Sequence, residues 1–245
     1  MHPNIEASSK ACVSRNAILA RLPGEELARL AADAELVEVP AHTVVLDASE
    51  EVTHIHFICQ GLASAFALMR DGRTAEAITV GTEGFIGFPA LIDGPRSLFR
   101  VMALVDIKAL RVPMQTVRAE VRRGGVLTDL VNRYLHMRVR QLSQLVACNG
   151  LHTVEERLAR WLLHASDTLG SVRLPFTQER IADMLGAQRT TVTAAARKLE
   201  LAGAIAYKRG QIDITDRSKL LESVCECYEE LRGQREMIRA EPDAG

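Results

Sequence analysis

FTQERIADMLGAQRTTVTAAARKLELA, residues 176–202, is the stretch that decides the fold. It predicts two short helices joined by a tight turn. Thr177 is suited to cap the first helix, because its hydroxyl can accept a hydrogen bond from a backbone N–H two or three residues on. Gly186 should end that helix, since glycine adopts the left-handed backbone that a sharp turn needs. The second helix is then expected from about Gln188 to Ala202.

The second helix has one apolar face and one polar face. Its apolar residues recur at i, i+3, i+4 and i+7 and should be buried together: Val192, Ala195, Ala196 and Leu199. The opposite face suits the major groove of DNA, where arginine binds guanine and threonine or alanine meets thymine methyl groups. We expect the base-reading residues to be Arg189, Thr190, Thr193 and Ala194. A surface helical hairpin with solvated charges would show the same periodicity.

The residues that follow favour DNA binding. The stretch AIAYKRGQIDIT (204–215) alternates in polarity on either side of Arg209-Gly210, which predicts a β-hairpin with a basic tip. Two helices and such a hairpin form a winged helix. We expect the phosphate contacts to come from the helix ends and the hairpin: Thr177, Gln178, Arg197, Lys198, Lys208 and Arg209. Residues 177–217 contain seven Lys/Arg and five Asp/Glu, a slight basic excess.

The rest of the chain predicts an α+β protein. Between residue 36 and residue 113 the pattern changes toward a period of two, with β-rich segments at 43–46, 54–59, 62–69, 74–80 and 101–112. Arg70-Asp71-Gly72-Arg73 predicts a hairpin turn, and several short strands suggest a sandwich, barrel or jelly roll. A helix of about six turns follows Gly124-Gly125. Its wide apolar face predicts a homodimer seam, although burial within one subunit would also use it.

These patterns give four parts. Residues 1–122 form a β domain with N-terminal helices, and 123–148 a dimerisation helix that ends at a hinge, Asn149-Gly150. Residues 149–216 form the winged helix, in which Trp161 should be buried. Residues 217–245 form a last helix, to about 238, and a polar tail.

Composition excludes several classes of protein. The net charge is −1, 47% of the residues are hydrophobic, and no run of 18 apolar residues or signal peptide is present. Five scattered cysteines argue against a disulfide framework and for a reducing cytoplasm. No nucleophile elbow, phosphate loop or acid–base pair is visible, so we do not expect an enzyme.

The C-terminal stretch resembles the DNA-binding end of the Crp/Fnr family of bacterial transcription regulators. The similarity rests on Thr177, Gln178, Ile181, Ala182, Gly186, Arg189, Thr191, Val192, Leu199, Glu200, Gly203 and Ile205. The order of the elements over about 16–216 is also similar, although glycines often found near His42 and Ser49 are absent. The resemblance implies an N-terminal β-roll (double-stranded β-helix or jelly roll), a homodimer on an inverted repeat of double-stranded DNA, and RNA polymerase as a further partner. Family members often have an acid at 190 and a base at 194, so Thr190 and Ala194 imply a different DNA sequence.

Many members of this family bind a cyclic nucleotide in the β-roll. Their cassette resembles GFIGFPALIDGPRSLFRVMA (84–103), but Phe88 stands where the ribose-binding glutamate is expected. A phenyl ring cannot accept from ribose hydroxyls, so the sequence argues against cyclic nucleotide as a ligand. A pocket for a more apolar, unidentified effector would use Phe85, Gly87, Phe88, Arg96 and Ser97.

Other members sense through iron–sulfur clusters held by N-terminal cysteines, but only Cys12 lies there. His54-x-His56 has no visible third ligand. Cys225-x-Cys227 falls on the predicted last helix, where side chains two residues apart diverge. We therefore expect no metal site. A factor without an effector, a thiol- or metal-based redox sensor, and a β-roll module that docks on protein remain open alternatives.

Overall fold

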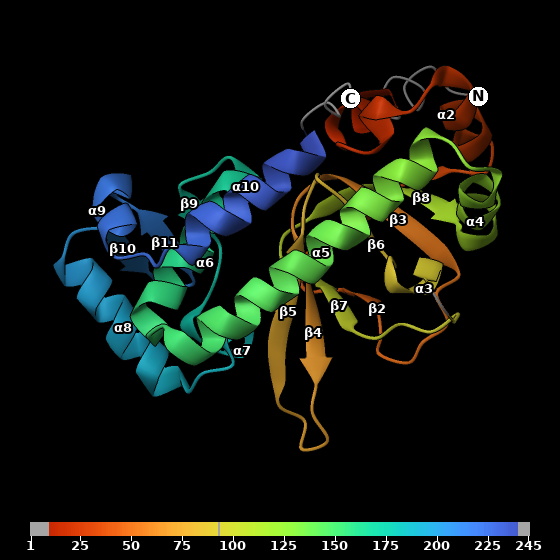
Figure 1. Ribbon diagram of the computed structural model, residues 1–245. Helices are drawn as coiled ribbons and strands as arrows, with labels where there is room; N and C mark the ends of the chain where they lie inside the picture. Colours follow the sequence, from red (N-terminus) through yellow and green to blue (C-terminus); the bar gives the residue numbers. More distant parts are fainter. Residues whose placement is uncertain (1–9, 93, 240–245) are drawn as a thin grey trace. The chain divides into compact units, whose positions relative to one another are not determined.

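The computed structural model describes residues 10–92 and 94–239 and has the predicted α+β composition (Figure 1). The chain forms two compact units. Of the described residues, one unit contains 10–65, 78–92, 94–139 and 234–239, and the other contains 66–77 and 140–233. The predicted polar tail, from 240 on, lies outside the described residues.

The described N-terminal part begins with helical residues 10–15, followed by η1 (Leu19–Arg21), α2 (Gly24–Ala31) and then strands. In the described residues the strands form two four-stranded sheets, ordered β1-β8-β3-β6 and β2-β7-β4-β5. Their bounds are Glu35–Val39 (β1), Val44–Leu46 (β2), His54–Gln60 (β3), Ala63–Leu68 (β4), Thr74–Val80 (β5), Phe85–Ile86 (β6), Arg100–Ala103 (β7) and Ile107–Pro113 (β8). The predicted segment 101–112 is thus two strands, which belong to different sheets. Helices α3 (Pro89–Ile92) and α4 (Met114–Arg123) complete this part.

Several turns follow from the sequence. Gly72 has φ +85° between β4 and β5, and Asp71 Oδ1 accepts a hydrogen bond from the backbone N–H of Arg73, as the hairpin prediction requires. His42 and Ser49 have φ values of 67° and 65°. Residues with a Cβ rarely adopt this left-handed region of backbone conformation. The positions near which the resemblance led us to expect glycine therefore keep the glycine-like backbone without the glycine.

Helix α5 (Val126–Leu151) is the longest element. Its first half buries Tyr134 and Arg138 completely or nearly so. The Arg138 guanidinium donates to Glu83 Oε1 at 3.1 Å, to Tyr134 Oη at 2.6 Å and to the backbone oxygen of Thr79 at 2.9 Å. Burial alone would raise the pKa of Glu83, but the charges of Arg138 and Arg235 bring it below its usual value. A buried ion pair therefore holds this half of α5 on its own β domain.

Gly84 allows α5 to approach that β domain closely. A Cβ at this position would lie 2.2 Å from the Tyr134 ring, well inside van der Waals contact. The Tyr134 ring also stacks on Phe85 with 4.7 Å between the ring centroids. The glycine is thus required by packing.

The C-terminal part begins with α6 (Val154–Leu169). Helix α5 runs through Asn149-Gly150 to Leu151, so the expected break comes at His152-Thr153, where Thr153 caps α6. The remaining elements are β9 (Arg173–Leu174), α7 (Gln178–Leu185), α8 (Arg189–Leu201), β10 (Ile205–Lys208), β11 (Gln211–Ile214), α9 (Arg217–Glu222) and α10 (Cys227–Arg239). The single last helix predicted for 217–238 is wrong, because the chain leaves helical geometry at 223–226.

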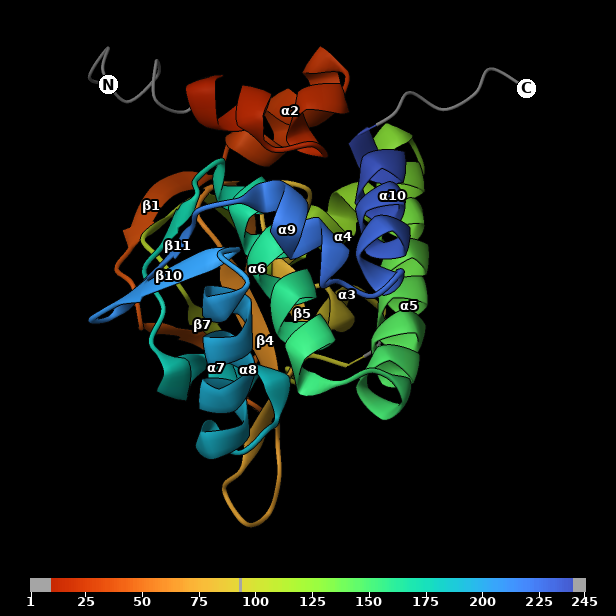
Figure 2. The ribbon, with the colours of Figure 1, turned by 90° about the vertical axis from the view of Figure 1, so that its left-hand side faces the viewer.

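Helix α10 lies antiparallel along α5 in both views (Figures 1 and 2). Arg133 donates to the backbone oxygen of Met237 at 2.8 Å, and Gln144 donates to Cys227 Sγ at 3.1 Å. An ion pair between Arg140 and Glu230 lies between these two contacts along the helices. Helix α10, which lies beyond the stretch 16–216 of family resemblance, is therefore a partner of α5.

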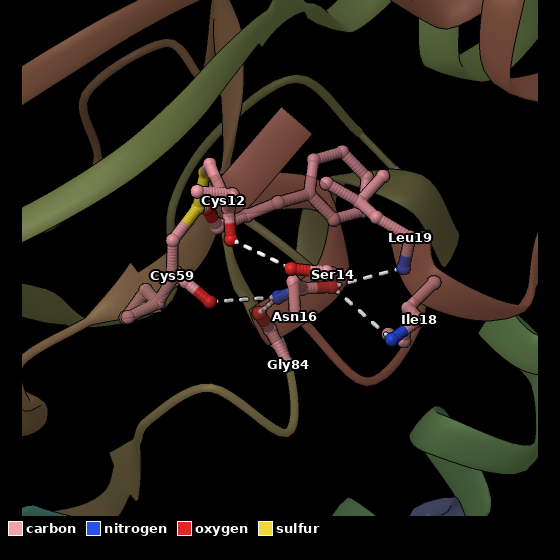
Figure 3. Close-up of a disulfide and its surroundings, with 10 residues drawn as sticks. Cys12, Ser14, Asn16, Ile18, Leu19, Cys59 and Gly84 are labelled. Carbon is pink, nitrogen blue, oxygen red and sulfur yellow. Dashed lines mark hydrogen bonds between the residues drawn. A yellow bond between two sulfur atoms is a disulfide. The ribbon is translucent and has the colours of Figure 1, made fainter. Parts of the chain in front are cut away.

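Cys12 and Cys59 form a disulfide, with Cα atoms 4.9 Å apart (Figure 3). The scattered cysteines argued against a disulfide framework, and for this pair that expectation is wrong. Beside it, the buried Asn16 amide donates to the backbone oxygens of Ile58 and Gly84. The bond joins two segments that are 47 residues apart, which sequence spacing could not pair.

In the described part of the chain no helix is long and apolar enough to cross a membrane.

We predict that Arg138→Met destabilises the protein by about 3–5 kcal/mol, because the buried Glu83 carboxylate loses the guanidinium that donates to it and keeps only the charge of Arg235. Urea unfolding followed by far-UV circular dichroism measures the loss. Arg138→Met combined with Glu83→Gln should recover much of it. Arg140→Met removes an exposed pair on the same helix and should cost less than about 1 kcal/mol. Equal losses of unfolding free energy in Arg138→Met and Arg140→Met would contradict the stabilising role of the buried Arg138–Glu83 pair.

Candidate nucleic-acid interface

Helix α7 begins and ends as its sequence predicts. The Thr177 hydroxyl accepts from the backbone N–H of Arg180 at 3.2 Å. Gly186 is left-handed, with φ +57°, and its N–H bonds back to the Ala182 carbonyl. The left-handed Gly186 allows the chain to pass from α7 to α8 within three residues.

The buried face of α8 fixes how the helix is presented. Val192 and Leu199 are fully buried, and Ala195 and Ala196 are 5% and 3% exposed. This face packs on α6 and α7. Trp161 of α6 is buried as predicted, with its ring edge-to-face against Phe176 at 4.9 Å between centroids. Because these contacts leave α8 little rotational freedom, the opposite face is held toward solvent.

The four predicted base-reading residues all lie exposed on that face. Thr193 is tied to the neighbouring helix, since its hydroxyl lies 2.8 Å from Gln178 Oε1 and 2.9 Å from the Arg189 carbonyl. One hydroxyl proton serves only one acceptor at a time. The structure thus brings Gln178, predicted to bind phosphate, beside Thr193, predicted to read bases.

The predicted phosphate-binding cations fall into two groups. Lys198 pairs with Glu155 at 2.9 Å, and Lys208 pairs with Asp213 at 2.8 Å. The Lys208 hydrogen bond lowers the pKa of Asp213. Both lysine side chains are about 70% exposed, so these pairs are weak and can exchange for a phosphate. Arg197 and Arg209, like Arg189, are exposed and make no side-chain pair within residues 10–92 and 94–239.

The wing is a hairpin of the predicted register. Ile205 lies opposite Ile214 and Tyr207 opposite Ile212, and Gly210 takes a left-handed backbone next to Arg209 at the tip. A third strand, β9, pairs with β11 through Leu174 and Ile212. Sequence reasoning missed β9, because two residues are too few to show alternation.

The five residues predicted to line an effector pocket have different surroundings. Phe85 and Phe88 are buried against Tyr134, with Phe88 edge-on to its ring at 5.9 Å. Gly87 has φ +97° and lies against the aliphatic side chains of β3 and the loop before it. Arg96 is exposed and donates to the Ser49 carbonyl at 2.8 Å. The Ser97 hydroxyl donates to the Phe99 carbonyl at 2.7 Å.

A winged helix-turn-helix that follows a β domain and a long helix defines a DNA-binding transcription regulator. Family comparison agrees on both parts. Residues 36–123 match the cyclic nucleotide-binding domain, and residues 156–223 match the Crp-like helix-turn-helix domain. The chain belongs to the Crp/Fnr family of transcription regulators.

Individual relatives are distant but nearly full-length. The CRP-like cAMP-activated global transcriptional regulator of Mycobacterium tuberculosis is 23% identical over 216 residues, or 85% of this chain and 96% of the relative. The nitrogen fixation regulation protein FixK of Bradyrhizobium diazoefficiens is 24% identical over 233 residues, which cover 90% and 94% of the two chains. The structure of FixK2 from Bradyrhizobium japonicum has the same fold, with a TM-score of 0.68, 18% identity and coverage of 78% and 98%.

We predict that Arg189→Ala weakens binding to a specific site by about 1–3 kcal/mol and relaxes selectivity at one base pair. Arg209→Ala is the matched control. It removes an exposed arginine at the wing, so it should weaken all sequences alike and reduce the slope of log K against log salt by about 1. Fluorescence anisotropy on specific and scrambled duplexes measures both. If Arg189→Ala lost equal affinity on the two duplexes, Arg189 would not be a base-reading residue.

Proposed function

We propose that this protein is a homodimeric transcription factor that binds an inverted repeat in double-stranded DNA. The observation that carries the proposal is the exposed face of α8, where Arg189 and Arg197 have no side-chain partner among the described residues and lie beside hydroxyl and methyl groups. Its helix is too firmly packed to turn this face inward. An arginine-bearing helix face of this kind fits the major groove.

Helix α5 supports the homodimer. On the side of α5 away from its contacts with α10, four aliphatic residues recur at alternating steps of four and three: Leu135, Val139, Leu142 and Val146. Val139 and Val146 are 63% and 74% exposed in the isolated chain. Valine at alternate positions of such a seam, with leucine between, is typical of two parallel helices. Pairing through this seam would cover apolar surface that one chain leaves in water.

The dimer would set the two α8 helices about 34 Å apart, which is one turn of DNA. The partners in this proposal are therefore DNA, a second copy of the chain and, where transcription is activated, RNA polymerase. The place of action is the cytoplasm, where bacterial DNA lies. We propose no catalytic activity.

We infer that cyclic nucleotide is not the effector. Phe88 supplies no acceptor for ribose hydroxyls, and its ring already packs on Tyr134. An exposed Arg96 that donates to the Ser49 carbonyl also fits this inference better than a buried phosphate site. An effector of another kind would act only through unequal affinity for two conformations. A regulator that works without an effector is equally compatible with these contacts.

Selection of bound duplexes from a random pool tests the proposed function. We expect enrichment of one inverted repeat, in the presence or absence of cell extract. Enrichment only with extract would indicate that a metabolite is needed. No enriched sequence under either condition would overturn the proposal and favour a protein-docking module instead.

We predict that Val139→Glu and Val146→Glu, alone or together, shift the protein from dimer to monomer, because each buries a carboxylate opposite its own copy in the seam. Sedimentation velocity should show mass falling from twice 26.9 kDa toward one chain. Leu98→Glu is the control, since Leu98 is 71% exposed and lies off α5. A dimer that survives both seam substitutions would place the subunit contact elsewhere.

A further inference from the structure

Four side chains with metal-binding atoms meet at the C-terminal end of α5. Cys148 comes from its last turn, His152 follows the helix, and Cys225 and Cys227 come from the entry to α10. Their sulfur and nitrogen atoms all lie within 4.8 Å of one another. All four belong to the same compact unit.

The backbone explains why these residues converge. Cys148 and His152 are four residues apart at a helix end, so they share one face. Cys227 is the first residue of α10, and Cys225 precedes the helix. The expectation that the two thiols diverge on a helix was therefore wrong, because the helix does not include both. A Cys-x-Cys segment outside helical geometry can direct both thiols toward one point.

The separations match those of a tetrahedral metal site. Cys148 Sγ lies 3.7 Å from Cys225 Sγ, and Cys227 Sγ lies 3.6 Å from His152 Nδ1. Zinc bonds are about 2.3 Å long to sulfur and about 2.0 Å long to nitrogen. In a tetrahedral site these lengths place two sulfurs about 3.8 Å apart, and a sulfur and a nitrogen about 3.6 Å apart. The remaining pairs are at most 4.8 Å apart, so small side-chain rotations suffice to bring all four donors onto one ion.

Burial and outer contacts also fit a bound metal. The three cysteines are 0%, 4% and 1% exposed and form no disulfide. Gln144 Nε2 donates to Cys227 Sγ at 3.1 Å. His152 Nε2 faces the Glu226 carboxylate at 3.3 Å, which leaves Nδ1 directed at Cys227. A carboxylate on the far nitrogen is the arrangement that orients a metal-bound histidine.

We propose that Cys148, His152, Cys225 and Cys227 bind one zinc ion in a closed Cys₃His site. Three thiolates and one imidazole in a tetrahedron select zinc among the common divalent ions. An iron–sulfur cluster spreads its thiolates around several iron atoms, whereas these four donors surround the space of a single ion. Four protein ligands leave no open position for a substrate, so the zinc is structural.

The zinc would bind the C-terminal segment to the end of α5. His152 immediately precedes Thr153, the cap of α6, so the metal would also order the start of the DNA-binding domain. The free energy of metal binding adds to the stability of segments that are far apart in sequence. The site is independent of the proposed DNA sequence and of any effector.

Metal content of the full chain, purified without chelator, provides the test. Inductively coupled plasma mass spectrometry should find about one zinc per chain and no stoichiometric iron. Cobalt(II) added to chelator-treated protein should give thiolate-to-cobalt charge-transfer absorption and the intense visible bands of tetrahedral cobalt. The cobalt measurement uses the unaltered chain, so it does not depend on whether a variant folds.

Substitutions locate the site. Cys148→Ser and Cys225→Ser should each lose the zinc, whereas Cys12→Ser combined with Cys59→Ser should keep it. Glu226→Ala should weaken zinc affinity about 10–100-fold and retain the stoichiometry. Glu222→Ala, which changes an exposed carboxylate outside the cluster, is its control and should change nothing.

Three results would overturn the proposal. The first is a chain without zinc that also gives no tetrahedral cobalt spectrum. The second is iron with acid-labile sulfide in place of zinc. The third is zinc retained at full stoichiometry by both Cys148→Ser and Cys225→Ser.

Discussion

Helix α5 has more apolar surface than its own β domain covers, and the proposed assembly depends on this constraint. Its inner face is held by Tyr134 and by the buried pair of Arg138 and Glu83. Its outer face leaves Val139 and Val146 in water, an arrangement that calls for a second chain. Its C-terminal end collects the thiols. One helix thus anchors its own β domain and carries both the proposed dimer seam and the proposed metal site.

The DNA-binding elements could be predicted from sequence because their determinants are local. Thr177 and Gly186 act on backbone groups within a few residues, and the buried face of α8 follows from a 3.6-residue period. The wing needs only Arg209-Gly210 between two alternating runs. Each signal and its structural effect lie within one short segment.

The cysteine chemistry could not be predicted, because its determinants are distant in sequence. Cys148 meets Cys225 only after α10 folds back along α5, and Cys12 meets Cys59 across 47 residues. The same limit applies to the β domain. Gly84 and Phe85 suggested a ligand cassette by resemblance, yet Gly84 makes room for Tyr134 and Phe85 packs on that ring. In this structure both residues pack against α5.

The central claim is that α5 pairs two chains so that two copies of α8 read DNA one helical turn apart. Affinity for the selected inverted repeat, measured while base pairs are inserted between its half-sites, tests this claim most directly. An insertion of five base pairs turns one half-site to the opposite side of the duplex, and we predict that it reduces affinity to the level of a single half-site. Affinity unchanged by that insertion would contradict the account.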